Sequence, residues 1–238
     1  MLRDIRDMIS LQRKDWVLGY LLILGGWVLG FAIMLIICRF DQGEEIFPMG
    51  GLICSMLFTV YWAACMLLYL PFWFSMAVSM GRTRKRFFVS YFAAEFTEAF
   101  LGLTLMLLLT GTEEWVYRMR YPDRISVTSL ASYGLKYGVF AAAVLLSLCG
   151  VCAAMIMKWG KRVFAVLWLL WMFLCMGVPQ ILSASKEAPE SIFGRAGKGL
   201  IFLAQSLRPS QWAGVAMAVT VAAIAGSYLI LRRQRVDL

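Results

Sequence analysis

The sequence predicts an all-α polytopic membrane protein whose chain crosses the bilayer six times. Hydrophobic residues make up 61% of the 238 positions, charged residues make up only 16%, and the mean hydropathy is +0.75. Soluble globular domains carry about 25% charged residues, so this composition excludes that class. Lys and Arg are concentrated in short segments between long apolar runs. Together these observations indicate one transmembrane domain over residues 1–238.

The first 15 residues predict a basic amphipathic helix on the inner leaflet. Leu2, Ile5 and Ile9 recur at helical spacing, while Arg3 and Arg6 are among the cations on the opposite face. The apolar run that follows is too long for the core of a cleaved signal peptide, so we expect it to remain as the first span.

Six apolar runs are the predicted spans. A helix rises about 1.5 Å per residue, so roughly 20 residues cross a hydrocarbon core of about 30 Å. The predicted spans are residues 16–38, 49–80, 88–110, 135–157, 163–182 and 212–231.

Prolines and glycines predict irregularities within this layout. Pro71 predicts a kink near Leu70, and Gly177 with Pro179 predicts an irregular end to the fifth span. Residues 111–133 are expected to form a loop. Within the longer loop 183–211, the apolar residues 200–204 are too few to span, and they predict a re-entrant helix bounded by Gly199 and Pro209.

The distribution of charge predicts the orientation. Four inner segments hold 14 of the 23 Lys and Arg residues in 34 positions, whereas three outer loops hold 8 in 62 positions. Positive charge is retained on the cytoplasmic side, so we expect both termini to be cytoplasmic and the chain to lie in the inner cell membrane. The net charge of +9 then reflects orientation against anionic lipid, and nucleic acid is not an expected partner. The inner segments are residues 1–15, 81–87, 158–162 and 232–238, and the outer loops are 39–48, 111–133 and 183–211.

The densest basic segment joins the second and third spans. Arg82, Arg84, Lys85 and Arg86 lie in seven residues between two apolar runs. Gly81 is expected to end the preceding helix, and Thr83 to cap the next one, which would place a short amphipathic turn along the membrane surface. One interpretation is a topology signal only; the other is a surface that a cytoplasmic partner binds.

Glu95 and Glu98 stand out as the acids within the predicted spans. Ionisable groups in a span cost about 2.5–3.5 kcal/mol each unless they face a polar cavity or a partner. Their spacing of three residues places them on one helical face. Three roles stay open: catalysis, lining or gating of a channel, and structural pairing near the interface.

Side-chain chemistry argues against an enzyme. The chain has no His, so Ser-His and Cys-His nucleophile pairs, the zinc-binding helix motif and an imidazole relay are excluded, and no metal or cofactor site is expected. All six Cys residues fall in apolar runs and are interpreted as small buried hydrophobic residues. They are Cys38, Cys54, Cys65, Cys149, Cys152 and Cys175.

The layout of the chain resembles the permease subunits of type 2 ABC exporters. The resemblance covers nearly the whole chain in layout: an N-terminal amphipathic helix, six spans and a re-entrant segment before the last. In residues it depends mainly on the segment 79–88, Ser-Met-Gly-Arg-Thr-Arg-Lys-Arg-Phe-Phe, which is similar to the coupling-helix region of small bacterial members.

The resemblance implies a separate cytoplasmic ABC ATPase subunit, which would bind ATP and Mg²⁺. That subunit would dock on the turn formed by Arg82, Thr83, Arg84, Lys85, Arg86, Phe87 and Phe88. A second permease, identical or different, would complete a channel through which a peptide, a lipid-like amphiphile or a drug moves outward. The alternative is a self-contained secondary transporter or a membrane sensor partner, although residues 1–110 and 134–238 show no internal repeat of the kind common in secondary transporters.

Overall fold

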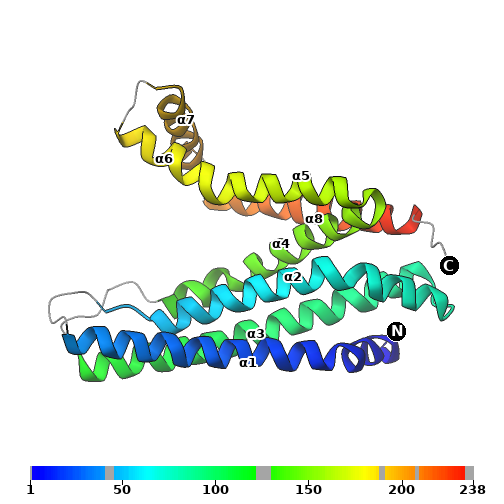
Figure 1. Ribbon diagram of the computed structural model, residues 1–238, viewed down its shortest axis with the longest axis horizontal. Helices are drawn as coiled ribbons and strands as arrows, with labels where there is room; N and C mark the ends of the chain where they lie inside the picture. The colour runs from blue at the N-terminus through cyan, green and yellow to red at the C-terminus, as the bar shows by residue number, and fades with distance from the viewer. Residues whose placement is uncertain (1, 41–45, 122–129, 188–190, 207–208, 234–238) are drawn as a thin grey trace.

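The computed structural model describes residues 2–40, 46–121, 130–187, 191–206 and 209–233, and its elements are helical (Figure 1). The helices are α1 (Leu2–Phe40), α2 (Met49–Ser79), α3 (Arg84–Arg120), α4 (Leu130–Trp159), α5 (Lys161–Met172), the π-helical segment η2 (Phe173–Gly177), α6 (Val178–Glu187), α7 (Ile192–Ser206) and α8 (Pro209–Arg233). The prediction of an all-α fold is confirmed.

Five helices in the described part, α1, α2, α3, α4 and α8, are long and apolar enough to cross a membrane. Large apolar side chains remain exposed along them, as Val28, Val60 and Val221 illustrate. Such surfaces are expected where lipid replaces water as the surrounding solvent. A multi-pass membrane protein is therefore supported, with five such helices where the sequence predicted six.

The predicted fifth span, 163–182, divides into three pieces. α5 has only 12 residues, and the π-helical turns of η2 separate it from the 10-residue α6. Val178 donates its amide to the carbonyl of Phe173, five residues earlier. Pro179 has no N–H and cannot continue the ordinary ladder, which is why the helix changes its hydrogen-bonding pattern here. The irregularity that Gly177 and Pro179 predict at this end is confirmed, and the helical segment continues beyond residue 182 to Glu187.

The chain nevertheless runs along the long axis of the molecule six times. α1, α2, α3 and α4 alternate in direction, α5 with η2 and α6 runs back, and α8 returns (Figure 1). The N-terminal end of α1, the α2–α3 turn, the α4–α5 turn and the C-terminal end of α8 consequently lie at the same end of the molecule. We call this the basic end, because Lys and Arg side chains gather there.

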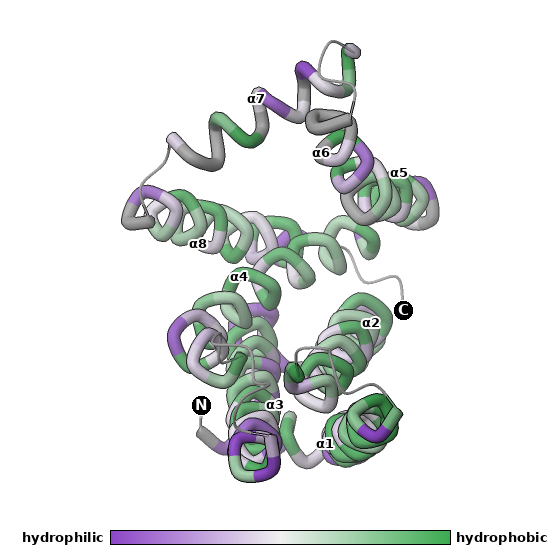
Figure 2. The backbone as a smooth tube through the Cα atoms, turned by 90° about the vertical axis from the view of Figure 1, so that its left-hand side faces the viewer, coloured by the Kyte–Doolittle hydropathy of each residue, from purple (hydrophilic) through white to green (hydrophobic). Residues whose placement is uncertain are grey.

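The helices form a bundle and an attached arm. α1, α2, α3 and α4 pack against one another, and α8 packs against α4 and α3. α5 contacts α4 but not α8, and the two lie on opposite sides above α4 in Figure 2. α6 and α7 pack against each other, farthest from α1. In the described part of the chain, the arm of α5, η2, α6 and α7 thus contacts the bundle through α4, and the chain continues from α7 into α8.

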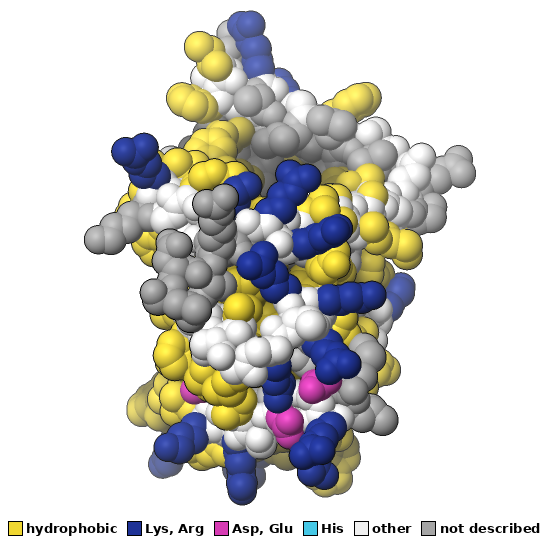
Figure 3. Space-filling view, turned by 90° about the vertical axis from the view of Figure 1, so that its right-hand side faces the viewer, with side chains coloured by type: hydrophobic (Ala, Val, Ile, Leu, Met, Phe, Trp, Pro, Cys, Tyr) yellow, Lys and Arg dark blue, Asp and Glu magenta, His cyan; other side chains and the backbone are white. Residues whose placement is uncertain are grey.

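The basic end carries most of the inner segments that the sequence identified. Figure 3 views this end directly and shows many Lys and Arg side chains with few acidic ones. The predicted grouping of positive charge at one end of the helices agrees with this arrangement.

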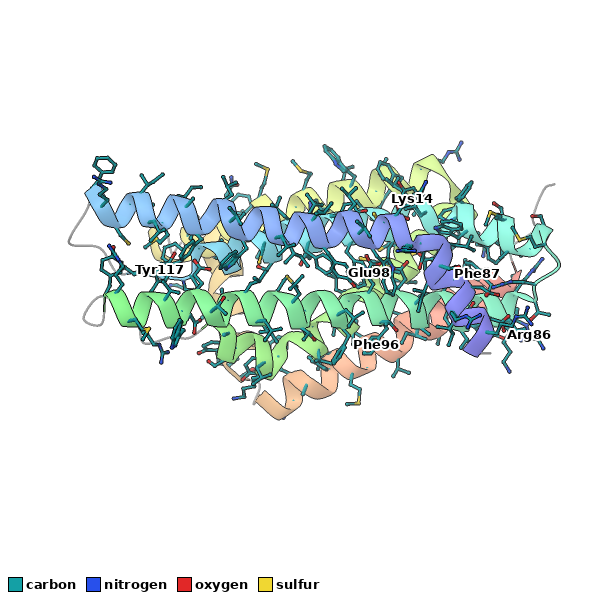
Figure 4. All side chains as sticks on the ribbon, turned by 90° about the horizontal axis from the view of Figure 1, so that it is seen from below. Lys14, Arg86, Phe87, Phe96, Glu98 and Tyr117 are labelled. Carbon is teal, nitrogen blue, oxygen red and sulfur yellow. The ribbon has the colours of Figure 1, made fainter. Side chains whose placement is uncertain are left out.

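The N-terminal amphipathic segment is part of α1 and not a separate helix. α1 is continuous from Leu2 to Phe40, with a bend near Lys14 (Figure 4). Met8 is buried in the main core, and Gln12 is buried too. Packing on α2 and α3, and not only on lipid, thus holds this segment.

The main core lies between α1, α2, α3 and α4. Its largest buried side chains include Trp62 and Phe74 of α2 and Phe87 and Tyr91 of α3. α2 runs through Pro71 as one helix, so the proline does not end it. The five Cys residues whose side chains are described, those other than Cys175, are free thiols, as the sequence indicated.

The expected loop 111–133 is wrong at both of its ends. α3 continues to Arg120, and α4 begins at Leu130. Charged residues suggested a loop, but Glu113 is fully buried, at 0% exposure. The Gly50 amide donates to its Oε1 and the Gly51 amide to its Oε2, both at 2.9 Å, and Tyr117 Oη donates to Oε1 at 3.0 Å.

The carboxylate of Glu113 in α3 caps the N-terminal end of α2. The first amides of a helix have no partner within it, and Pro48 provides no side-chain cap here. Glu113 accepts two of these hydrogen bonds and places negative charge at the positive end of the helix dipole. An acid that looked like a loop residue therefore holds α3 against the start of α2.

The loop 183–211 is also more helical than expected. α6 continues to Glu187, and α7 covers residues 192–206, which include the apolar stretch 200–204. The helix expected in this loop is present, but it begins at Ile192 and runs through Gly199, and the last helix begins at Pro209 and not at residue 212. That α7 is re-entrant, entering the membrane and returning to the same side, stays a prediction.

Gly30→Ala should destabilise the contact between α1 and α2. A Cβ at Gly30 would lie 2.6 Å from Gly50 Cα and 2.7 Å from the carbonyl oxygen of Met49. Both are backbone atoms, so the helices must separate, and we expect a loss of about 1–3 kcal/mol in the free energy of unfolding. The control is Gly25→Ala on the same helix, where nothing lies within 4 Å; it should be neutral or stabilising by about 0.5–1 kcal/mol. Unfolding in detergent micelles measures both, and equal losses would refute the close contact.

Glu113→Ala should destabilise the fold by roughly 2 kcal/mol or more, because it leaves the amides of Gly50 and Gly51 without their acceptor. Thr112→Ala is the matched control, because Thr112 is exposed and bonds only to the carbonyl of Leu109 in its own helix; we expect a change within about 0.5 kcal/mol. The same unfolding assay compares the two. A Glu113→Ala variant as stable as the control would contradict the capping role.

Candidate functional site

Glu95 and Glu98 both point from α3 into the interior between α1 and α2. Their exposures are 4% and 5%. Figure 4 shows Glu98 between α1 and α3. The two acids therefore share one buried face, as their spacing predicted, yet their environments differ.

Glu95 is held by hydrogen bonds on both oxygens. Gln12 Nε2 of α1 donates to Oε1 at 2.9 Å, and Trp62 Nε1 of α2 donates to Oε2 at 3.0 Å. One carboxylate thus ties three helices together. Of the roles left open by the sequence, structural pairing fits this geometry best.

Glu98 makes no hydrogen bond with the described part of the chain. It lies beside Gly19 of α1, where a Cβ would be 3.6 Å from Glu98 Oε1. A buried carboxylate without a donor is costly, so its presence calls for a ligand, an ion or water.

A small polar pocket opens at these acids, with a volume of about 10 Å³. That is about the space that one water-sized group requires. We call it the acidic pocket, because three of its lining residues are acids and none is Lys or Arg. It is lined by Gln12, Asp15, Cys65, Tyr69, Trp73, Glu95 and Glu98.

The sequence identified only two of the lining residues. Gln12 and Asp15 both lie in residues 1–15, the segment that was interpreted as a membrane-surface helix. A signal for them did exist: Gln12, Asp15 and Gly19 follow one another at spacings of three and four, which places them on one helical face. Only the bend and packing of α1 bring that face against Glu95 and Glu98.

The basic turn between α2 and α3 has the caps that the sequence indicated. Gly81 adopts a φ of +76°, and the Arg82 amide donates to the carbonyl of Ala77 at 3.0 Å, which ends α2. Thr83 Oγ1 accepts from the Arg86 amide at 3.4 Å and begins α3. α3 then continues without a break, so the turn contains no separate coupling helix. That part of the prediction was wrong, because one cap follows directly on the other.

The cations of this turn connect three helices at the basic end. Arg82 forms an ion pair with Asp7 of α1, with 3.0 Å between Nη2 and Oδ2. Arg84 Nη1 donates to the carbonyl of Arg232 in the last turn of α8, at 2.6 Å. Lys85 and Arg86 are exposed. Two cations thus hold the turn in place, and two are left on the surface.

The two phenylalanines do not form an exposed anchor. Phe87 is 0% exposed; its ring stacks on Tyr91 and meets the edge of Phe74, with centroids 5.5 and 5.4 Å apart. Phe88 is half-buried against Phe92 of α3 and Tyr228 of α8. Phe87 therefore belongs to the core that carries the turn.

Glu95→Gln and Glu98→Gln should differ in stability. An amide at position 95 places an NH₂ group against one of the two donors, Gln12 Nε2 or Trp62 Nε1, and should cost about 1–3 kcal/mol. Glu98→Gln removes no such bond and serves as the matched control, with no loss expected. Thermal unfolding of the purified chain in detergent tests this. A greater loss for Glu98→Gln would show that the assignment of roles is reversed.

The structure thus gives two separate features, an acidic pocket within the bundle and a basic turn at its end. Comparison with protein-family models, curated proteins and solved structures found no match to this chain.

Proposed function

We propose that this chain is the membrane-embedded permease subunit of a type 2 ABC exporter. In this proposal it lies in the cytoplasmic membrane with both termini and the basic end on the cytoplasmic side. A separate ABC ATPase binds ATP and Mg²⁺ and docks at the α2–α3 turn. The transported substrate is a peptide, a lipid-like amphiphile or a drug.

The connectivity of the α2–α3 turn is the observation that carries the proposal. The turn joins α2 and α3 by covalent bonds, is paired with α1 through Arg82 and Asp7, and contacts α8 through Arg84. A displacement applied to it is therefore transmitted to four membrane-crossing helices. A subunit driven from outside the membrane needs such a point of contact, whereas a topology signal does not.

Lys85 and Arg86 are the residues we assign to the ATPase contact. They are the exposed cations of the turn, and they lie directly before the buried ring of Phe87. A rigid core below an exposed charged surface transmits force better than a flexible loop. In this view Phe87 transmits the motion and does not bind the partner.

The arm gives room for a second permease. Among the described elements, α5 packs on α4 and η2, and its Trp168, Leu169 and Trp171 are exposed. In the proposal, lipid or a second permease, identical or different, covers this surface.

A self-contained secondary transporter is the second candidate, and the acidic pocket favours it. Such transporters hold coupling ions at polar sites within the spans, next to interrupted helices. Here the interrupted segment η2 lies in the arm, away from the acidic pocket, which argues for the exporter.

Lys85→Glu combined with Arg86→Glu should release the ATPase. Exposed ion pairs contribute about 0.2–1 kcal/mol each, and reversal of two charges also adds repulsion, so we expect roughly tenfold less ATPase retained. The experiment copurifies the tagged chain, at matched membrane levels, with the ABC ATPase that the proposal expects to be encoded next to it. The control is Arg118→Glu combined with Arg120→Glu, two exposed cations at the opposite end of the same helix.

The control variant should retain as much ATPase as the wild type. Equal loss in both variants would show a nonspecific charge effect. A wild-type chain that retains no ATPase would overturn the exporter proposal and leave the self-contained transporter.

A further inference from the structure

We infer that the acidic pocket between α1, α2 and α3 binds a primary ammonium group. This inference does not depend on the proposed function, since the pocket is built entirely from this chain.

The charge of the pocket calls for a cation. Asp15, Glu95 and Glu98 line it, and no Lys or Arg is among the lining residues. Glu95 and Glu98 are buried among apolar helices and have lost most of their water, Asp15 is half-buried beside them, and the three carboxylates repel one another. A bound positive charge offsets both costs.

Three residues that line the acidic pocket have hydrogen-bond acceptors without a donor in the described part of the chain. Both oxygens of Glu95 are occupied by donors from Gln12 and Trp62. Gln12 is 3% exposed, and its Oε1 has no hydrogen-bond partner within the described residues. The carboxylates of Glu98 and Asp15 also accept no hydrogen bond from the described residues. The free acceptors thus come from three residues, and an ammonium group has three N–H donors.

The size of the pocket and its set of acceptors favour an ammonium group over other cations. A volume of about 10 Å³ admits one compact head group and excludes a tetramethylated nitrogen. In the described part of the chain, no three or more Cys, Asp or Glu side chains are close enough together to hold a metal ion. Hard metal ions need oxygen ligands at about 2.0–2.6 Å, whereas an ammonium N–H donates to an oxygen acceptor at an N···O distance of about 2.7–3.2 Å.

Aromatic residues at the edge of the pocket suit the rest of such a ligand. Tyr69 and Trp73 line it, and Tyr69 is 42% exposed. Their rings can contact an alkyl chain, and their π faces attract the cation itself. The ligand is therefore an alkyl primary amine, either free in solution or carried as the head group of an aminophospholipid.

The test uses the full chain purified in detergent free of amine lipids. One arm titrates butylammonium chloride and the other a short-chain phosphatidylethanolamine, with tetramethylammonium chloride and sodium chloride at equal ionic strength as ion controls. Thermal unfolding and intrinsic Trp fluorescence report binding. We expect saturable stabilisation by a primary amine and none by the control ions. Saturation by butylammonium identifies a free amine as sufficient; saturation by the lipid alone identifies the head group as the source.

Glu98→Gln and Asp15→Asn should each weaken that binding at least tenfold, because each removes a charged acceptor without removing a hydrogen bond seen in the fold. Asp4→Asn, on α1 outside the pocket, is the matched control and should bind as the wild type does. Size-exclusion profiles confirm that each variant is folded. Equal stabilisation by tetramethylammonium, wild-type binding by both Glu98→Gln and Asp15→Asn, or no saturable binding in either arm would each overturn the inference. None of these results bears on whether the ATPase copurifies.

Discussion

The structure depends on one buried carboxylate at the end of the bundle opposite the basic end. Glu113 of α3 accepts the amides of Gly50 and Gly51, the first orphan donors of α2, and the hydroxyl of Tyr117. In a hydrocarbon environment an unpaired amide has no water to bond with, so this contact removes a cost that no lipid could remove. It fixes the register between α2 and α3 at one end, and the tight turn through Gly81 and Thr83 fixes it at the other.

Close packing of α1 follows from that register. Gly30 lies against the backbone of Gly50, which is possible because neither residue has a side chain. Because Gly30 holds α1 against α2 at this end, the buried face of α1 meets α3 nearer the basic end. There, Gln12 of α1 donates to Glu95 of α3. The acidic pocket is therefore a consequence of helix register: Asp15 and Glu98 face it because Gly30, Gly50 and Glu113 have already positioned their helices.

The two functional proposals draw on different ends of this arrangement. The basic turn lies where four helices are connected, and it is suited to receive a force from outside the membrane. The acidic pocket lies within the bundle, between helices that the turn would move. An exporter that senses a cationic ligand would need both, although each is argued from its own contacts and is tested separately. Among the described residues, α5 of the arm packs on α4, and the chain leads from α7 directly into α8, which also packs on α4; α4 is therefore common to both links of the arm with the bundle.

The sequence by itself determined the class of the protein, the helical elements, the caps at Gly81 and Thr83, and the grouping of Lys and Arg between the helices. These follow from composition, periodicity and local hydrogen bonding, which act over a few residues. Only the tertiary structure decided the partners of the buried acids. Glu113 resembled a loop residue, Asp15 a surface residue, and Glu95 and Glu98 a matched pair, because the cost of a charge in a membrane depends on which donors other helices bring to it. The continuation of α3 to Arg120 was decided in the same way, since it depends on hydrogen bonds that local sequence patterns do not specify, whereas Gly177 and Pro179 already indicated the irregular fifth pass.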